Sequence, residues 1–340
     1  MMKYRRISIL IYFCFLWFVG PVSANPIPDT SPLPKVWDNL YGTAGEPLSL
    51  YDVYLVAPQK LRITLLFDPV RTTNYWNADG KSDNLGSLFS FIHSPKIYSR
   101  SNLPFSIAYG IAQSFEIEFR RAFVSRSRII PYLPESLLVE PYWNRYETTK
   151  GLGDISLRLR VKILGEQTKF FYFATGIGTK FASSAEFKQT DDLPISPGST
   201  DIFFGIYNAI KLGRFILPSF CTYSHTGRYQ STMPMGEIIT YRIGLIANIH
   251  RFLDFNFNLQ GYEITKQSGL SYRYLTVGTF DKSAVIIPQE VYKTQIGWGL
   301  TVRGFKLPAV ISLGLAYDLR GKKTFKNTFS ANASLQIDFH

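Results

Sequence analysis

The stretch Gly151–Leu164, GLGDISLRLRVKIL, constrains the fold more than any other part of the chain. From position 155 to position 163 its apolar residues stand at odd positions: Ile155, Leu157, Leu159, Val161 and Ile163. Its polar residues stand between them: Asp154, Ser156, Arg158, Arg160 and Lys162. A period of two places the two sets on opposite faces of a β-strand, whereas a helix would mix them. A strand of this kind fits the wall of a barrel that crosses a lipid bilayer.

The same alternation recurs along the chain and predicts about twelve strands. They cover residues 61–68, 105–111, 115–120, 151–164, 169–181, 201–212, 214–224, 239–249, 253–260, 295–303, 311–317 and 329–339. After the first 24 residues, no stretch approaches the roughly 18 consecutive apolar residues that a transmembrane helix needs.

The connections between these strands alternate between short and long. The short ones lie near residues 112–113, 165–167, 213, 250–251 and 304–308, and the long ones are 72–103, 125–150, 182–200, 225–236 and 265–288. This alternation is typical of an all-β, transmembrane, antiparallel up-and-down barrel with tight periplasmic turns, large outer loops and both termini periplasmic. Partial alternation in Ser271–Phe280 leaves open a further hairpin, which would make fourteen strands.

Residues 1–24 read as a signal peptide. Lys3, Arg5 and Arg6 precede an apolar core at Ile7–Val19, and Val22-Ser23-Ala24 fits a small-residue cleavage site. The chain is therefore expected to be secreted through the inner membrane of a Gram-negative envelope, and the predicted barrel localises it to the outer membrane.

Residues 25–58 are rich in proline, which removes the N–H donors that a central strand needs. We expect a periplasmic N-terminal segment over 25–58 and the barrel over 59–340. Trp37, Leu40 and Tyr41 leave open the alternative that part of this segment folds into the mouth of the barrel.

The composition excludes some function classes. Hydrophobic residues make up 46% of the chain and aromatic residues 16%, which suits strands and membrane-interface girdles. The formal net charge of +12 raises nucleic acid as a partner, but the secretion signal and the lack of a basic run interleaved with aromatics argue against it. Cys221 would be alone after signal removal, so no internal disulfide is expected.

Three short motifs carry a family resemblance. They are Gly151-Leu152-Gly153-Asp154-Ile155, the stretch Leu193–Asp201 (LPISPGSTD), and Ala108-Tyr109-Gly110-Ile111 ahead of an acidic strand. Over about Leu61 to His340 the chain resembles the outer-membrane channel family named for the meta-cleavage pathway of phenol degradation. The resemblance implies a porin-like barrel that helps small, often aromatic or apolar, molecules cross the outer membrane.

No catalytic or ligand residue comes with these motifs. Gly151, Gly153 and Asp154 are expected to shape a turn and to satisfy N–H groups where the strand begins. The end of the chain departs from the usual pattern of such barrels, because Phe339 is followed by His340 rather than closing the chain. Insertion by the barrel assembly machinery is still expected.

Polar residues of the predicted inward faces are the candidate site. The candidate lumen-lining residues are Glu116, Glu118, Arg120, Arg158, Arg160, Lys162, Arg242, Asn256 and Asn258. A charge on the lipid face would cost roughly 2–4 kcal/mol at the midplane, which places these side chains inside. Acids of strand 115–120 are expected to pair with bases of strand 151–164 across the ladder. Two interpretations of these charged residues stay open. Either they form a constriction that selects solutes by charge, or they are ion pairs that fill a narrow lumen.

We therefore expect a passive channel for small solutes, with membrane lipid and the solute as partners and no cofactor, metal or catalytic residue. One alternative is a non-conducting structural or adhesin barrel. Another is a lipase-type barrel enzyme. For it, His225 stands next to Ser224 at a strand end, and nothing in the sequence supplies a partner to orient the histidine.

Overall fold

The structure is a computed structural model that describes residues 49–76, 79–84, 97–132, 143–165, 170–181, 200–226, 228–229, 233–234, 237–265, 273–275, 283–285, 291–304, 308–322 and 324–339. The predicted signal peptide, most of segment 25–58 and His340 lie outside these residues. Those predictions therefore stay predictions.

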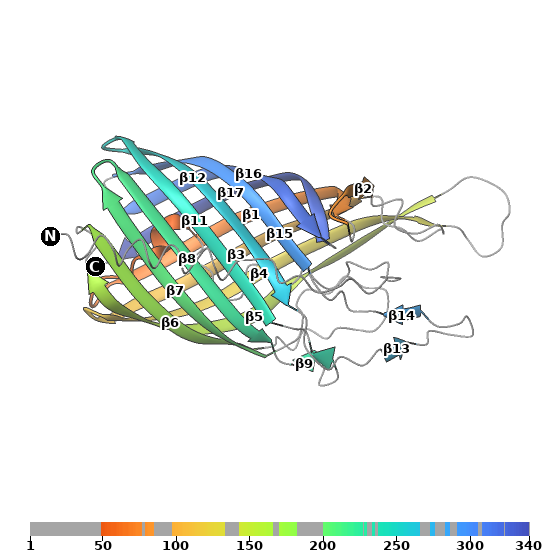
Figure 1. Ribbon diagram of the computed structural model, residues 1–340, viewed down its shortest axis with the longest axis horizontal. Coiled ribbons are helices and arrows are strands. Elements are labelled where there is room, and N and C mark those ends of the chain that lie inside the picture. The colour runs from red at the N-terminus through yellow and green to blue at the C-terminus, as the bar shows by residue number, and fades with distance from the viewer. Residues whose placement is uncertain are drawn as a thin grey trace. The chain divides into compact units, whose positions relative to one another are not determined.

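Twelve strands form one closed antiparallel barrel (Figure 1). They are β1 (Leu61–Trp76), β3 (Ile97–Ala112), β4 (Phe115–Tyr132), β5 (Trp143–Gly165), β6 (Phe171–Phe181), β7 (Asp201–Leu212), β8 (Phe215–Thr226), β11 (Glu237–His250), β12 (Leu253–Thr265), β15 (Val291–Arg303), β16 (Ala309–Lys322) and β17 (Thr324–Phe339). Each pairs with its neighbours in chain order, and β1 pairs with β17, which closes the sheet. The predicted up-and-down barrel is confirmed.

The remaining short strands add nothing to the barrel wall. β2 (Ser82–Asn84) pairs only with the end of β1. Two separate hairpins form from β9 (Arg228–Tyr229) with β10 (Met233–Pro234) and from β13 (Arg273–Leu275) with β14 (Ser283–Val285). The hairpin left open around Ser271–Phe280 therefore forms its own small sheet, and the barrel does not reach fourteen strands.

Several strands run further than the alternation of apolar residues indicates. The predicted connections 72–103 and 125–150 are wrong in extent, because β1 and β4 continue into them and β3 and β5 begin within them. Beyond the apolar band, hydrogen bonds between neighbouring strands are enough to extend a strand, as at the pair Arg126↔Thr149. These strand ends carry no alternation of apolar and polar residues, so the sequence pattern does not reveal them.

The two faces of the barrel differ as the period of two requires. Leu157 and Leu159 are 39% and 38% exposed on the outer face of β5. Between and beside them, Arg158 and Arg160 are 3% and 1% exposed, on the inner face. Large apolar side chains stand outward on neighbouring strands too, including Ile117, Ile177 and Phe204. This outer surface suits lipid.

Gly151, Gly153 and Asp154 do not begin a strand, so the role expected for them is wrong. All three lie inside β5, and neither glycine is among the described glycines with positive φ. Asp154 instead faces inward, with an oxygen 3.4 Å from the ammonium of Lys180, which also lies 2.5 Å from a carboxylate oxygen of Asp201. This ion cluster ties β5, β6 and β7 together.

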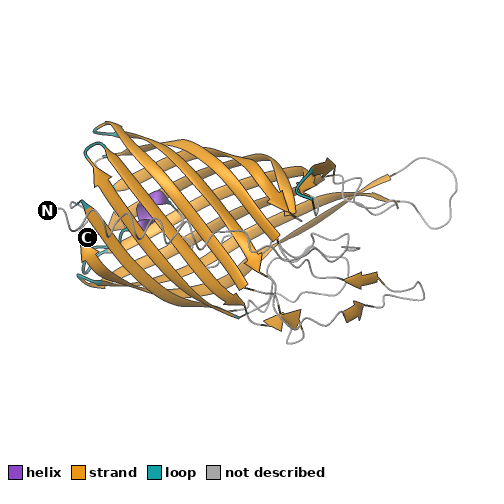
Figure 2. Cartoon of the chain, viewed as in Figure 1, coloured by secondary structure: helices purple, strands orange, loops and turns teal. Residues whose placement is uncertain are grey.

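One described helical turn lies inside the barrel (Figure 2). The 3-10 helix η2 (Leu50–Val53) is capped by Ser49, whose hydroxyl accepts from the N–H of Tyr51 while Asp52 accepts from the N–H of Ser49. Within the described part of the chain, no helix is long and apolar enough to cross a membrane.

Candidate functional site

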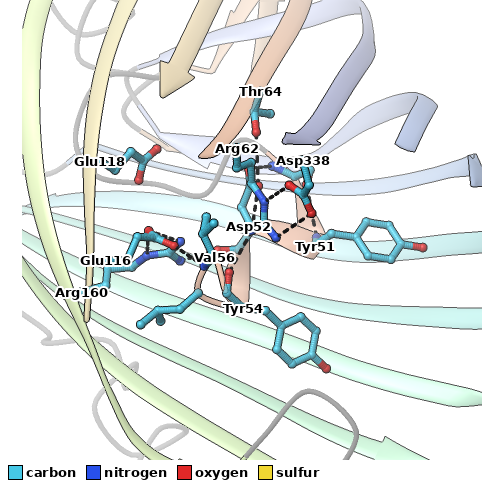
Figure 3. A network of polar contacts seen from close by, with 12 residues as sticks. Tyr51, Asp52, Tyr54, Val56, Arg62, Thr64, Glu116, Glu118, Arg160 and Asp338 are labelled. Carbon is cyan, nitrogen blue, oxygen red and sulfur yellow. Dashed lines mark hydrogen bonds and ion pairs between the residues drawn. The ribbon is translucent and has the colours of Figure 1, made fainter. Parts of the chain in front are cut away.

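Residues Ser49–Ala57, called the plug here, are held inside the barrel by wall side chains that bond their backbone (Figure 3). Arg160 donates to the carbonyl of Asp52, Arg62 donates to that of Tyr54 (3.0 Å), the Leu55 N–H donates to Tyr172 Oη (2.9 Å) and the Val56 N–H donates to Glu116 Oε2 (2.6 Å). These bonds satisfy backbone groups that have no sheet or helix partner of their own. The plug is therefore bonded to the wall along most of its length.

Arg62 joins the plug to the seam where the barrel closes. Its guanidinium lies 2.8 Å from Asp338 on β17 and 4.0 Å from the carboxylate of Asp52 in the plug. Thr64 donates to the same Asp52 carboxylate at 3.4 Å. Plug position and barrel closure are thus coupled through one buried cation.

The plug carries two tyrosines, and the hydroxyl of Tyr51 ties it to the barrel wall. Tyr51 donates its hydroxyl to Asp254 on β12, and Asp254 is held by Arg303 at 3.1 Å. Burial and then the Asp254 carboxylate raise the pKa of Tyr51, and burial raises the pKa of Tyr54 to about 12. Both phenols therefore stay neutral at physiological pH, and Tyr51 remains a donor.

Apolar contacts place the plug against one side of the lumen. Val53, Tyr54 and Leu55 pack in one buried cluster. Their wall partners on β6, β7 and β8 are Tyr172, Ala174, Tyr207, Ala209 and Phe220. The rings of Tyr54 and Tyr172 meet edge to face with centroids 4.9 Å apart. This side of the lumen is filled.

The predicted acid–base pairs between β4 and β5 are present. Glu116 lies opposite Arg160 and Glu118 opposite Arg158 in the ladder. Arg160 is 2.5 Å from the Glu116 carboxylate, and Arg158 contacts Glu118 and donates to Tyr207 at 3.0 Å. Because these groups are almost fully buried, the pairing offsets a large desolvation cost.

A cavity remains on the opposite side of the lumen, with an empty volume of about 1160 Å³, part of it open to solvent. The plug residues Ser49, Leu50 and Tyr51 border it. Of the candidate lumen-lining residues, Arg120, Arg242, Asn256 and Asn258 border the cavity. Glu116 and Arg160 hold the plug, Glu118 and Arg158 form a buried pair, and Lys162 lies half-buried near the end of β5.

Sequence reasoning missed Arg62, Tyr172 and Asp254 as plug contacts. Arg62 carries the signal that could have found it, since it alternates with the apolar Leu61 and Ile63. Tyr172 stands in a nearly continuous run of apolar residues. In such a run, alternation does not indicate which side chains face the lumen and which face outward.

Ser224 and His225 point to opposite faces of β8. Ser224 is 1% exposed and faces the interior, whereas the His225 side chain is 57% exposed. Neighbouring residues of a strand point to opposite faces, so these two side chains do not form a nucleophile and base.

Gly110 on β3 lies against the C-terminal end of the plug. Pro58 bridges to Gly110, and a β-carbon there would lie 2.1 Å from the carbonyl oxygen of Ala57. Gly110→Ala is expected to displace the plug at a cost of about 1–3 kcal/mol and to lower, by several degrees, the temperature at which the barrel loses its compact form on SDS gels. Gly153→Ala is the control, because its β-carbon would lie 3.4 Å from Ala122 O. Equal temperatures for both variants would contradict this.

Comparisons with known proteins place the fold. No protein-family model matches the chain, and no curated protein matches it. The chain is similar to the crystal structure of an outer membrane channel from Pseudomonas putida F1, at 9% sequence identity, over 85% of this chain and 98% of that one, with a TM-score of 0.59. It is also similar to the toluene transporter TodX of P. putida, at 11% identity, over 87% and 93%, with a TM-score of 0.43. At such identities the first likeness shows a shared fold.

Proposed function

We propose that the protein is a passive outer-membrane channel for small solutes, held closed in this state by the plug. The observation that carries the proposal is the contrast between the two faces of the barrel. The outer face is apolar, and the inner face surrounds a polar cavity bordered by the hydrogen-bonded plug. An apolar outer face gives the barrel a place in lipid, and a polar interior gives a solute a path.

The lining charges indicate which ions would pass. Among the described residues that border the cavity, the charged ones are Arg100, Arg120, Arg242 and Asp68, of which Arg100 and Asp68 form an ion pair at 3.3 Å. Arg120 lies 3.2 Å from the carboxylate of Glu118 on the same strand. Cations therefore outnumber carboxylates among the described residues that border the cavity. The candidate residues Arg120 and Arg242 would select anions, with Asn256 and Asn258 lining the same path, whereas Glu116 and Arg160 would act through the plug.

The sequence resemblance implies aromatic or apolar molecules as the solute class. We also propose, on the same resemblance, membership of the channel family named for the phenol meta-cleavage pathway. Membrane lipid, the solute and the barrel assembly machinery are the proposed partners. A non-conducting adhesin barrel is the alternative, and it differs in showing no current.

The test is a planar-bilayer recording of the folded full-length protein across a KCl gradient. The wild type is expected to show discrete steps of current. Its reversal potential is expected to shift from zero toward the equilibrium potential of chloride. Arg242→Ala is expected to lower the chloride-to-potassium permeability ratio about fivefold, since one lumen charge contributes about 1 kcal/mol after screening. Arg214→Ala, which removes the same charge from an exposed turn, is the control. An unchanged reversal potential in Arg242→Ala would rule out this residue as a selector.

A further inference from the structure

The apolar outer face of the barrel ends along one edge across β1, β3, β4 and β5, which are neighbours in the sheet (Figure 1). The outward apolar run of each of these strands ends at an exposed residue, namely Phe67, Leu103, Phe123 and Leu152. Phe123 lies opposite both Leu103 and Leu152 in the ladder, so the edge is continuous from β3 to β5. The edge lies away from the tight turns, toward the long connections. In a barrel that crosses a bilayer, such an edge marks where hydrocarbon gives way to lipid headgroups.

Beyond this edge the outward residues, apart from one proline, carry hydroxyl groups or positive charge. The first row beyond it is Pro69, Ser101, Ser125 and Lys150, and the second row is Arg71, Ser99, Ser127 and Thr148. Each row consists of direct partners in the ladder. The four serines are half-buried, whereas Arg71, Thr148 and Lys150 are exposed. These two rows are called the headgroup patch here.

Three cations point outward in the headgroup patch or beside it. Arg71 and Lys150 belong to its rows. Arg121 stands on the outer face of β4, two residues before Phe123, and its Nε donates to the carbonyl oxygen of Gly153 at 3.3 Å. None of the three forms an ion pair with a carboxylate that the structure describes. At the edge of the hydrocarbon, such long side chains can extend their charges into the headgroup layer.

The described carboxylates lie elsewhere. Those on the four strands face the lumen, and they are Asp68, Glu116, Glu118 and Asp154. Glu237 on β11 and Glu263 on β12 point outward, but three strands separate β5 from β11 and three separate β12 from β1, so they stand on the opposite side of the barrel. Asp83 on β2 lies opposite Tyr75, four residues beyond Arg71. The headgroup patch thus combines cations and hydroxyl groups without a carboxylate among its described side chains.

We propose that the headgroup patch binds a phosphorylated acyl glycolipid, the chemical class of lipid A. The parts of such a molecule match the surface in order. Its acyl chains lie on the apolar face below the edge, its phosphates meet Arg71, Lys150 and Arg121, and its sugar hydroxyl groups bond the serines. A diacyl phospholipid offers acyl chains and phosphate but no sugar for the serine rows. In the proposed orientation this end faces outward, where an outer membrane presents its glycolipid. The inference goes beyond the channel, since it concerns only the outer surface and requires no solute to pass.

The test titrates the detergent-folded full-length protein with three lipids and measures the bound fraction by native mass spectrometry. The lipids are lipid A with two phosphates, lipid A with one phosphate, and cardiolipin, which carries two phosphates but no sugar. Lipid A with two phosphates is expected to bind about fivefold more tightly than the form with one, and at least about tenfold more tightly than cardiolipin.

Arg71→Ala and Lys150→Ala are each expected to weaken the binding of lipid A about fivefold, because each removes one cation from the headgroup layer. Together they are expected to weaken it about 25-fold, since β1 and β5 are three strand spacings of about 4.8 Å apart and the two effects should add. Replacing Ser101 and Ser125 together with alanine is expected to weaken lipid A about fivefold and to leave cardiolipin unchanged.

Arg214→Ala, which removes the same charge from an exposed turn at the other end of the barrel, is the control variant. The heat-dependent gel shift checks that each variant is folded. An equal loss of lipid A binding in Arg214→Ala and Arg71→Ala would mean that any exposed cation attracts the phosphates, and it would overturn the proposal. Equal affinities for lipid A and cardiolipin would show that the serine rows recognise no sugar and would overturn it as well.

Discussion

Replacing Arg160 with alanine is expected to raise the open probability of the channel in planar bilayers at least about tenfold. Arg160 donates to the plug carbonyl of Asp52 and neutralises Glu116, whose other oxygen accepts from the plug N–H of Val56. Without the guanidinium, Glu116 is a buried carboxylate without its cation, a state that costs about 3–5 kcal/mol. Withdrawal of the plug admits water to Glu116 and relieves that cost. Each 1.4 kcal/mol shifts the open-to-closed ratio tenfold.

Arg158→Ala is the matched control for this experiment. Arg158 lies two residues away on the same face of β5, is equally buried and also belongs to a cross-strand ion pair, but its bonds to Glu118 and Tyr207 stay within the wall. Its removal is expected to destabilise the barrel by a similar amount without opening it. If the two variants show the same open probability, the plug is not what closes the lumen.

Leu159→Arg is expected to destabilise the folded barrel in phosphatidylcholine vesicles by about 2–4 kcal/mol in a urea titration. The Leu159 side chain is 38% exposed on the outer face of β5. An arginine there would place a charge in the hydrocarbon layer. The side chain could lower that cost only by extending its guanidinium toward the membrane interface. This variant therefore asks whether lipid covers the outer face.

The control places the same charge where water is expected. Gln113→Arg changes an exposed residue of the tight turn between β3 and β4 and is expected to alter the unfolding free energy by less than about 0.5 kcal/mol. Leu159→Ala separates loss of apolar area from gain of charge. Equal stability of Leu159→Arg and Gln113→Arg would mean that the outer face of β5 does not meet a hydrocarbon layer.

The barrel and its faces were accessible from the sequence because one local rule decides both. Parity along Gly151–Leu164 puts Arg158 and Arg160 on the face opposite Leu157 and Leu159, and the structure does the same. The partners of these arginines also followed, because Glu116 and Glu118 have matching parity on the neighbouring strand. The strand ends beyond the apolar band did not follow, since ladder bonds there need no pattern.

The plug was not accessible in this way. Its helical turn spans only the four residues Leu50–Val53, too few for any periodicity to show. Its position depends on contacts that exist only once the barrel has closed, such as Arg62 with Asp338, 276 residues apart. Proline content marked residues 25–58 as unlike a strand, and that composition fits a linker and a plug equally well.

Liposome swelling with the purified full-length chain tests the central claim most directly, that solutes pass through this barrel once the plug yields. Proteoliposomes are expected to swell in isotonic solutions of small solutes, at rates that fall with solute size and rise in the Arg160→Ala variant. The gel shift shows whether the wild type and the Arg160→Ala variant are folded. If vesicles containing either folded protein swell no faster than vesicles of lipid alone, for every solute, the barrel is not a channel.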